Sequence, residues 1–516
     1  MERPIRVRIA PSPTGPLHIG TARTALFNLL YARRHGGTFV LRLEDTDVVR
    51  SELALEKDIL EGLHWLGITW DEGPEIAGED AVGPYGPYRQ SERLASYETA
   101  LSRLLDTDKA YPCYCTPEEL EADRKAQQAV GEAPRYVGTC SALTVEERAE
   151  RAGRGLKAVV RFRVEDRTVT FHDLVRGDIT SPTSAFGGDF VIARSDGSPL
   201  YHFAVVVDDA AMEISHVIRG EDHISNTPKH ILLFEALGAP IPEFAHLPLI
   251  LNPDRTKMSK RLSQTGVSEY VAQGFVREAL INYLALLGWS PGTEEELFTL
   301  EELGRRFDLD RVQPAGAVFD RQRLEWLNGQ WIRRLPDDEL VARVLPFLDA
   351  HLAILEAGGA VVRHPDDEDV AALLPMVRER LPTLAAIGEL VDFLFVEEIA
   401  VDADLVVPKR WDRETTTEAL RAARKVIADV GAVSYEADEL EPALRALAEA
   451  REWKAGDLFM AIRVAVTGRT ATPPLFDTLV ALGYERTLER IDRAIEAVAS
   501  GAAAVTPPTG AHTADA

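Results

Sequence analysis

The chain has few cysteines and no long apolar segment. Three cysteines among 516 residues are too few for the disulfide framework of a small secreted domain. No stretch approaches the ~20 consecutive apolar residues that a membrane-spanning helix requires. Pro4 and its charged neighbours leave no signal-peptide-like apolar region at the N-terminus. We therefore expect a cytoplasmic protein that binds no membrane.

Positive charge is also scarce. The 57 Lys and Arg residues face 83 Asp and Glu residues, which gives a formal net charge of −26. A general nucleic-acid-binding protein normally carries a basic surface instead. Composition alone therefore does not favour RNA as a partner, and any RNA contact would depend on local basic patches that weaken with salt.

What the chain does have is length and an ordinary globular composition, 46% hydrophobic and 27% charged. Its length is too great for one core, so we expect about two to four domains. The N-terminal region reads as strand, turn, helix and strand. Apolar residues alternate with arginines over 5–9, prolines interrupt 11–16, a helix runs from His18 to the glycines at 36–37, and a second strand covers 38–43. This order predicts a crossover unit of a parallel sheet, with ligands at the C-terminal ends of the strands.

The turn of this unit lacks the G-x-G-x-x-G pattern of dinucleotide-binding folds. It carries His18, Gly20 and Thr21 instead, and His18 and Thr21 share one face of the first helical turn. An imidazole beside free N–H groups and the helix dipole suits a polyphosphate. The pattern is short, so a histidine that merely caps the helix is an equally good interpretation.

A basic cluster, Lys257-Met258-Ser259-Lys260-Arg261, follows a loop-forming Asn-Pro-Asp much later in the chain. Alone it is typical of a solvated loop, but with His18–Thr21 it resembles the HIGH and KMSKS signatures of class I aminoacyl-tRNA synthetases. The agreement is closer with the bacterial glutamyl-tRNA synthetase family and extends from the first strand to about residue 495. It rests on R-I-A-P-S-P-T-G-P-L-H-I-G at 8–20, L-E-D-T-D at 43–47 and V-I-R-G-E-D-H at 217–223.

The resemblance implies a glutamate–tRNA ligase that makes glutamyl adenylate from ATP and then transfers glutamate to the 3'-terminal adenosine of tRNA(Glu). It also implies an α/β fold, with a Rossmann-type parallel-sheet catalytic domain, an α+β insertion and an all-α anticodon-binding region. We expect the first half of the catalytic domain at 1–110, an acceptor-binding insertion at 111–198, the second half with the basic loop at 199–265, a stem-contact connector at 266–334, the helical region at 335–498 and a disordered tail at 499–516.

The pattern predicts further elements within these segments. We expect helices at 52–66, 91–105 and from Thr227 to near Gly238, and strands at 159–164, 169–172, 189–194, 200–207, 214–218 and 246–251. The run at 200–207 is almost wholly apolar and ends in two aspartates, which is typical of a buried parallel strand.

Adenylate formation needs positioning and charge stabilisation rather than a protein nucleophile. Positive and hydroxyl groups in the two motifs can serve the phosphates, and Mg²⁺ would arrive with ATP. The resemblance assigns catalysis to His18, Thr21, Lys257 and Lys260, and ATP binding to His18, Gly20, Asp222, Ile250 and Lys260.

An acidic amino acid needs two cations and one anion around it. Arg8 and Arg219 suit its carboxylates, because a guanidinium binds a carboxylate bidentately, and Glu44 suits its ammonium group. The alternative is that the two arginines pair with surface acids of the protein. By resemblance the glutamate pocket contains Arg8, Ala10, Ser12, Glu44, Tyr201, Arg219 and His223. His202 departs from the family, in which many relatives carry Asn, and a titrating side chain there predicts that glutamate affinity depends on pH near neutrality.

All three cysteines fall within the insertion: Cys113, Cys115 and Cys140. Thiolates at this spacing could hold Zn²⁺. Some relatives complete such a site with a histidine two residues after the third cysteine, where this chain has Ala142, and others use a tyrosine, for which Tyr136 could serve. The alternative is three reduced thiols packed in a small knob.

The C-terminal third is helical in pattern, and Arg378 and Arg380 fall where the family places arginines that approach the anticodon. Surface arginines of a helix are an equally good interpretation. We expect a monomer, as is usual in the family. The helical pattern argues against glutaminyl-tRNA synthetase, whose anticodon domains are β-barrels, and the length argues against the short glutamyl-queuosine enzyme. Intact His18, Lys257 and Lys260 argue against a non-catalytic RNA-binding paralogue. A small nucleotidyltransferase would not need the helical third.

Overall fold

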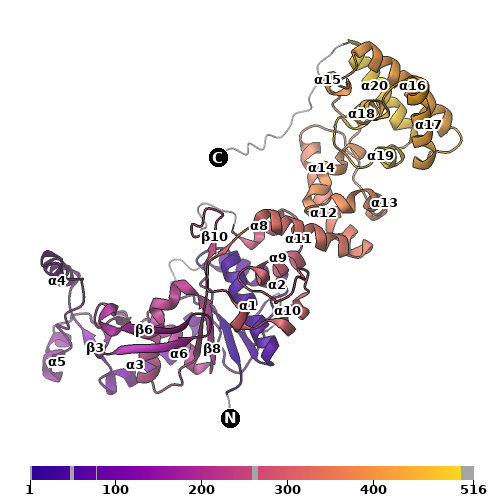
Figure 1. Cartoon of the computed structure of the whole chain (residues 1–516). Helices are drawn as coiled ribbons and strands as arrows, with labels where there is room; N and C mark the ends of the chain where they lie inside the picture. The colour runs from indigo at the N-terminus through magenta and orange to yellow at the C-terminus, as the bar shows by residue number, and fades with distance from the viewer. Residues whose placement is uncertain (1–2, 47–51, 77, 79, 259–264, 501–516) are drawn as a thin grey trace. The chain divides into compact units, whose positions relative to one another are not determined.

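The computed structural model describes residues 3–46, 52–76, 78, 80–258 and 265–500, and Figure 1 shows their arrangement as helices and strands. They form two compact units, Met1–Tyr270 with Arg277–Arg321 and Val271–Val276 with Gln322–Ala516. The first unit is α/β and the second is helical. No helix of the described chain is both long enough and apolar enough to cross a membrane.

The N-terminal crossover forms as expected. Strand β1 (Arg6–Ile9) pairs in parallel with β2 (Thr38–Leu41), and α1 (Ile19–His35) connects them. The helix ends because Gly36 takes the left-handed conformation at φ 61° and donates its N–H to the Ala32 carbonyl. One face of α1 is fully buried, which fixes the turn before it against the sheet.

The remaining strands of the central sheet come from distant parts of the chain. Strands β5 (Thr168–Asp173), β6 (Gly177–Pro182), β8 (His216–Gly220) and β9 (Glu243–Leu247) form a sheet of order β6-β5-β9-β8. Strand β1 lies beside β8, since the Ser215 N–H donates to the Arg6 carbonyl at 2.9 Å. The ends of β1 and β8 therefore lie close together, and half of the expected insertion extends this sheet.

The prediction of a strand at 200–207 is wrong. The structure has a helix there, α6 (Tyr201–Ala211). Five consecutive residues of this helix, Phe203–Val207, are buried, so it carries no polar stripe that would reveal a helical period. Its run of valines imitates a buried strand, and burial on all sides overrides the β preference of valine.

The other elements of the first unit mostly follow the expected order. The expected strand at 246–251 is split between β9 and β10, and β3 and β6 were not expected. The further bounds are α2 (Leu53–Trp65), α3 (Leu94–Asp106), β3 (Ala110–Cys113), α4 (Pro117–Ala129), α5 (Val145–Gly153), β4 (Val159–Phe162), β7 (Val191–Ala193), α7 (Thr227–Ala236), β10 (Ile250–Leu251), α9 (Arg277–Leu286), α10 (Leu300–Arg306) and β11 (Ala317–Val318).

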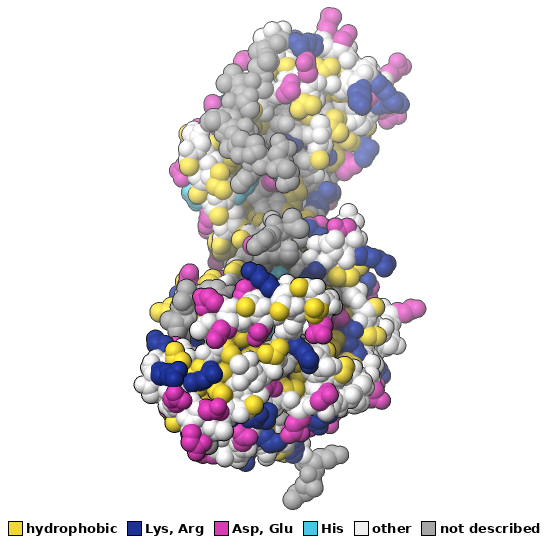
Figure 2. Space-filling view, turned by 90° about the vertical axis from the view of Figure 1, so that its left-hand side faces the viewer, with side chains coloured by type: hydrophobic (Ala, Val, Ile, Leu, Met, Phe, Trp, Pro, Cys, Tyr) yellow, Lys and Arg dark blue, Asp and Glu magenta, His cyan; other side chains and the backbone are white. Residues whose placement is uncertain are grey.

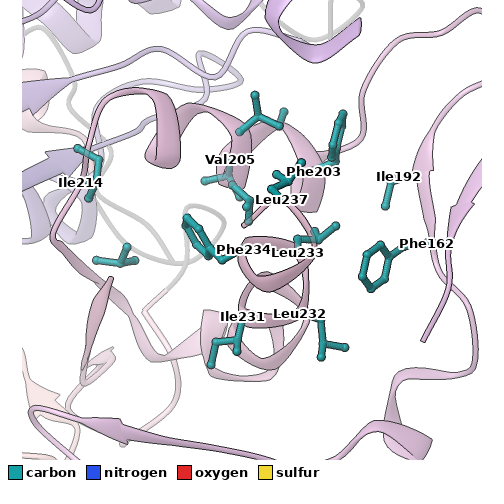
Figure 3. Close-up of a cluster of buried hydrophobic side chains, with 14 of the residues drawn as sticks. Phe162, Ile192, Phe203, Val205, Ile214, Ile231, Leu232, Leu233, Phe234 and Leu237 are labelled. Carbon is teal, nitrogen blue, oxygen red and sulfur yellow. The ribbon is translucent and has the colours of Figure 1, made fainter. Parts of the chain in front are cut away.

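One hydrophobic cluster of this unit gathers around α7. Figure 3 shows Leu233 and Phe234 of α7 near Phe203 of α6, with Phe162 of β4 and Ile192 of β7 beside them. All five side chains are buried, and each contributes about 1.5–3 kcal/mol of burial free energy. This packing fixes α6 and α7, which both carry side chains of the site described below.

The second unit is helical, as the C-terminal pattern predicts, and none of its described residues from 335 to 498 belongs to a named strand. Helices α8 (Val267–Ala272) and α11 (Arg321–Arg334) each have residues in both units. The expected tail cannot be examined, because 501–516 lie outside the described residues. The helices of the second unit are α12 (Asp337–Ala357), α13 (Asp367–Val377), α14 (Ile387–Val391), α15 (Ala403–Val406), α16 (Arg413–Gly431), α17 (Ala437–Ala450), α18 (Ala455–Thr467), α19 (Leu475–Leu482) and α20 (Tyr484–Ser500).

Candidate functional site

A cavity of about 390 Å³ lies where β1 and β8 end and α1 begins. Every residue that was expected to bind glutamate or ATP, or to act in catalysis, lines this cavity if it belongs to the described chain. Lys260 lies outside the described residues. The expected residues in the wall are Arg8, Ala10, Ser12, His18, Gly20, Thr21, Glu44, Tyr201, Arg219, Asp222, His223, Ile250 and Lys257.

His18 caps α1 and also lines the cavity, so the two interpretations of this histidine are compatible. Its Nδ1 accepts the Gly20 N–H at 2.9 Å, which leaves the proton of the neutral ring on Nε2. A Cβ atom at Gly20 would lie 3.1 Å from this Nδ1. Gly20 therefore leaves the space that the capping ring occupies.

Residues 259–264 lie outside the described residues, but backbone hydrogen bonds join the chain on either side of them to the start of α1 and to β10. The Ile19 N–H donates to the Thr265 carbonyl and the Val267 N–H to the Leu17 carbonyl, each at 2.9 Å. Before the gap, the Met258 N–H donates to the Ile250 carbonyl at 3.1 Å. The Lys257 Nζ lies 3.5 Å from Asp222 Oδ2. The first cation of the basic loop therefore faces the second residue after β8, which ends at Gly220.

Arg8 belongs to a buried network of ions at the wall of the cavity. Its Nε lies 3.1 Å from Asp209 Oδ1, and Arg42 Nη1 shares that oxygen at 2.8 Å. Arg42 Nη2 lies 3.3 Å from Glu44 Oε1. Burial raises the pKa of Glu44, although Arg42 and Arg8 oppose the shift. The same two arginines outweigh burial at Asp209 and lower its pKa. Arg8 therefore pairs with an acid of the protein, but with a buried one, Asp209, and not with a surface acid as the alternative supposes.

Arg219 differs from Arg8, since no described carboxylate pairs with it. Its Nη2 donates to Thr227 Oγ1 at 2.8 Å and to the His223 carbonyl at 3.3 Å, its Nε to His246 Nε2 at 3.2 Å and its Nη1 to His230 Nδ1 at 3.3 Å. Burial lowers the pKa of Arg219 to about 10, so the group stays charged at neutral pH. A buried cation without an anion is unfavourable, and its position in the cavity wall predicts an anionic ligand.

Tyr201 and His223 lie together at the same wall, with Tyr201 Oη 3.0 Å from His223 Nδ1. Burial raises the pKa of Tyr201 to about 12 and lowers the pKa of His223 to about 4. His202 is not part of the cavity lining. Burial lowers its pKa to about 4 as well, so the expectation that His202 titrates near neutral pH is wrong.

The three cysteines meet in a separate cluster. Their sulfur atoms all lie within 4.8 Å of one another, and Tyr136 Oη lies 3.4 Å from Cys113 Sγ and 3.8 Å from Cys115 Sγ. Burial raises the pKa of Cys113, but hydrogen bonds and the nearby Arg161 outweigh it and lower the net value. Burial and the neighbouring thiols raise the pKa of Cys115 to about 12. Four donor atoms are therefore gathered around one point.

Arg378 and Arg380 belong to the second unit and stand in different environments. Arg378 donates to the carbonyl groups of Arg333 and Leu335 and pairs with Asp337. Arg380 is exposed, without an acidic partner among the described residues. Burial, followed by the charge of Arg380, lowers the pKa of Arg463. Only Arg380 therefore offers its guanidinium to a partner.

Several residues of the site were not expected from the sequence. Arg42 interrupts the otherwise apolar run that was expected as the strand at 38–43. A charged residue in such a run was the one sequence signal for its role. Asp209 was noticed only as the end of a strand that does not exist. His230 and His246 are single histidines in apolar surroundings, which carry no recognisable spacing, and the cavity wall also includes Arg23, Thr24, Val205 and Met258.

Two family descriptions match this chain. One, "tRNA synthetases class I (E and Q), catalytic domain", matches residues 4–326, and the other, "Anticodon binding domain", matches residues 339–495. Together they cover both compact units.

Individual proteins match along nearly the whole length. The glutamate–tRNA ligase of Symbiobacterium thermophilum is 47% identical over 94% of this chain and 99% of its own. That of Heliobacterium modesticaldum is 46% identical over 95% and 97%, respectively. The crystal structure of a glutamate tRNA ligase from Elizabethkingia meningosepticum in complex with its amino acid superimposes with a TM-score of 0.84 at 34% identity, covering 96% of this chain and all of the other.

Proposed function

We infer the activity of this chain from its family: it belongs to the class I tRNA synthetases of the glutamate and glutamine branch. Within this branch it is a glutamate–tRNA ligase, as are the proteins that match nearly its full length. It joins L-glutamate to tRNA(Glu) in two steps. Glutamate and ATP first form glutamyl adenylate and pyrophosphate, and the glutamyl group then passes to the 3'-terminal adenosine of the tRNA.

The observation that carries the assignment to glutamate is the environment of Arg219. Its guanidinium is buried in the cavity wall, is charged, and has neutral acceptors only. A carboxylate of the substrate supplies the missing anion, and a charge-assisted hydrogen bond of this kind stabilises by about 1.5–3 kcal/mol. Arg8 presents a second cation, whose charge Asp209 already offsets.

The remaining groups of the pocket fit the rest of the amino acid. Glu44 is the carboxylate for the α-ammonium group, because it lines the cavity and the cationic ammonium favours its ionised form. Tyr201, with its Oη 3.0 Å from His223 Nδ1, adds a hydroxyl whose orientation is held, and Ser12 adds another. Ala10 leaves space for the carbon chain. Together these groups orient the α-carboxylate for attack on phosphorus.

The other side of the cavity suits ATP. His18 and Thr21 lie at the start of α1, where free N–H groups and the helix dipole attract phosphates. Lys257 and Lys260 neutralise the charge that develops on the leaving pyrophosphate. Gly20, Asp222 and Ile250 complete the nucleotide side. Mg²⁺ enters bound to ATP, whose phosphate oxygens supply most of its ligands.

ATP–pyrophosphate exchange with purified protein tests this assignment, run with and without total tRNA. Exchange should depend on glutamate and should not be supported by glutamine or aspartate. Charging of tRNA with radiolabelled glutamate tests the second step. Exchange with glutamine at an equal rate would contradict the choice of glutamate, and no exchange with any amino acid would contradict the ligase activity itself.

We also propose that the cysteine cluster holds Zn²⁺ through Cys113, Cys115, Cys140 and Tyr136. Three sulfur atoms within 4.8 Å of one another and a phenol oxygen at hydrogen-bond distance form the four-donor set that structural zinc prefers. Three thiolates and a phenolate leave two negative charges in excess around Zn²⁺. Two arginines offset that excess. The guanidinium of Arg161 lies 3.8 Å from the Tyr136 ring, and Arg151 lies beside Cys140.

The tRNA contact must rely on local patches. On the face shown in Figure 2, Lys and Arg side chains lie among Asp and Glu side chains, in keeping with the net charge of −26. We propose Arg380 as an anticodon contact, since it is exposed and close to Arg463, and Arg378 as its support through the bonds to Arg333 and Leu335. Charging should weaken with rising salt.

We further propose that the chain divides into the six segments that the resemblance implies, from the first half of the catalytic domain at 1–110 to the tail at 499–516. We also propose that the enzyme is a cytoplasmic monomer. The monomer is the family expectation, and the expected residues of the described chain line the cavity without a contribution from a second subunit. Light scattering on the purified protein tests this point, and a dimer mass would contradict it.

A further inference from the structure

We propose that Asp173 and His246 form a positioning pair that orients the Arg219 guanidinium for the carboxylate of glutamate. The inference rests on the proposed function, because it takes Arg219 as the cation that binds the substrate. Neither Asp173 nor His246 lines the cavity, so both act through Arg219.

The pair is buried and held by several hydrogen bonds. Asp173 and His246 are each 0% exposed, and His246 Nδ1 lies 2.6 Å from Asp173 Oδ2. Asp173 Oδ1 accepts the backbone N–H groups of Val175 and Arg176, both at 3.0 Å. The His246 backbone N–H also donates to Asp173 Oδ2, at 3.1 Å. The carboxylate is therefore held by its own backbone turn and can dictate the orientation of the ring.

The carboxylate decides which ring nitrogen of His246 carries the proton. An ionised carboxylate only accepts, so Nδ1 carries the hydrogen and Nε2 keeps its lone pair. That lone pair accepts the Arg219 Nε–H at 3.2 Å. Burial lowers the pKa of His246 against the opposing effect of Asp173, which keeps the ring neutral at neutral pH. A proton on Nε2 would instead face the N–H of Arg219 and repel it.

Arg219 is held on its other sides by neutral groups as well. His230 Nδ1 accepts from Nη1 at 3.3 Å, and the His230 Nε2–H in turn donates to His202 Nδ1 at 3.1 Å. Thr227 Oγ1 accepts from Nη2 at 2.8 Å. The protein thus fixes the plane of the guanidinium without cancelling its charge. This leaves the charge for the substrate, which an aspartate in direct contact would not.

The positioning pair joins two parts of the fold. Asp173 ends β5, which comes from the expected insertion, and it pairs in parallel register with Phe244 of β9. His246 lies on β9 and Arg219 on the neighbouring β8, where the two residues are register partners. The insertion therefore contributes a residue to the support of the glutamate pocket.

Asp173→Asn tests this pair with little change of shape. The asparagine keeps an oxygen for the backbone N–H groups of the turn, but its amide N–H₂ faces His246 Nδ1 and favours the tautomer with the proton on Nε2, as in the Asp→Asn variant of serine protease triads. KM for glutamate in tRNA charging should rise about 10- to 100-fold, with KM for ATP unchanged. The melting temperature should fall, because the amide N–H₂ also faces the backbone N–H of His246. Asp173→Glu should restore part of the affinity.

Asp178→Asn is the matched control, because Asp178 pairs with His172 at 2.7 Å on the same hairpin but both are exposed. It should leave KM for glutamate unchanged. If wild-type protein charges tRNA and Asp173→Asn shows the same KM for glutamate, the positioning role is refuted and the proposed function stands. If wild-type protein charges no tRNA with glutamate, the proposed function itself fails.

Nitrogen NMR of ¹⁵N-histidine-labelled wild-type protein tests the tautomer even if Asp173→Asn does not fold. His246, assigned by comparison with His246→Gln, should show Nδ1 protonated and Nε2 unprotonated at neutral pH. A protonated Nε2 would overturn the proposal.

Discussion

Arg8 and Asp209 form a buried ion pair, with the Arg8 Nε 3.1 Å from Asp209 Oδ1, whereas Arg219 in the same cavity wall has no described carboxylate beside it. Two arginines that look equivalent in the sequence are therefore unequal in the structure. Arg8 is part of a compensated network with Arg42 and Glu44. Arg219 carries the uncompensated charge.

Arg219→Ala should remove glutamate activation while ATP still binds. The loss of a charge-assisted contact costs about 1.5–3 kcal/mol, so kcat/KM for glutamate should fall by at least about 10- to 100-fold. The measurement is ATP–pyrophosphate exchange over a range of glutamate concentrations, with ATP binding followed separately. Arg194→Ala, at an exposed arginine that contacts Ser198, is the control. An unchanged KM for glutamate in Arg219→Ala would mean that the pocket is assigned wrongly.

Asp209→Asn should destabilise the first unit strongly. It removes the carboxylate that Arg8 and Arg42 share, and an uncompensated buried charge costs about 3–5 kcal/mol. Urea unfolding followed by a probe in the first unit measures this free energy. Glu165→Gln breaks the exposed pair with Lys109 and should cost about 0–1 kcal/mol. Equal losses in both variants would contradict the importance of the buried network.

The free energy of unfolding should fall as the pH drops from 6.5 towards 4. Burial lowers the pKa of His202 from 6.5 to about 4, so in this window the unfolded chain binds a proton that the folded chain does not. Protonation therefore favours unfolding as the pH falls. His202→Asn should reduce this slope, which unfolding curves at several pH values will show. His202 should cause no change of KM for glutamate with pH near neutrality. A pH dependence of this KM that disappears in His202→Asn would contradict the burial of His202.

Purified protein should contain about one Zn²⁺ per chain, as a closed four-donor site holds structural zinc. Elemental analysis measures this without reference to activity. Cys140→Ser should lose the metal, because Cys140 Sγ lies 3.6 Å from Cys115 Sγ within the cluster. The control Lys125→Ala, a substitution at the surface outside the cluster, should retain it. Less than about half an equivalent in wild-type protein would exclude the zinc proposal.

Gly20→Ala should lower activity with little net change in stability, because the weakened His18 cap is offset by the helix propensity of alanine. The added Cβ would lie 3.1 Å from His18 Nδ1 and displace the ring from the phosphate side of the cavity. A misplacement of this kind costs about 10- to 100-fold in rate, whereas alanine is the better helix former. Steady-state charging and thermal melting separate the two effects. Gly153→Ala, where nothing lies within 4 Å of the new Cβ, should leave activity unchanged and should not lower stability. Full activity of Gly20→Ala would contradict a role for the His18 ring.

Much of the fold could be read from local patterns. The crossover from β1 through α1 to β2 follows from alternation, a proline-rich turn and a glycine cap, all of which act between neighbouring residues. The helix at 201–211 could not be read in this way. Its apolar faces are all buried, and only the surrounding core decides that Phe203–Val207 pack as a helix.

By itself the sequence determined the type of site, which consists of an H-x-G helix start, a basic loop, two arginines and one glutamate. The long motifs that contain these residues identify the family. Only the tertiary structure decided the state of each group. The structure decides which acid pairs with Arg8, whether any acid pairs with Arg219, and which nitrogen of His246 is protonated. Each of these depends on residues more than 20 positions apart that folding brings into contact. Charge and hydrogen-bond partners are properties of that environment, and no local pattern in the chain records them.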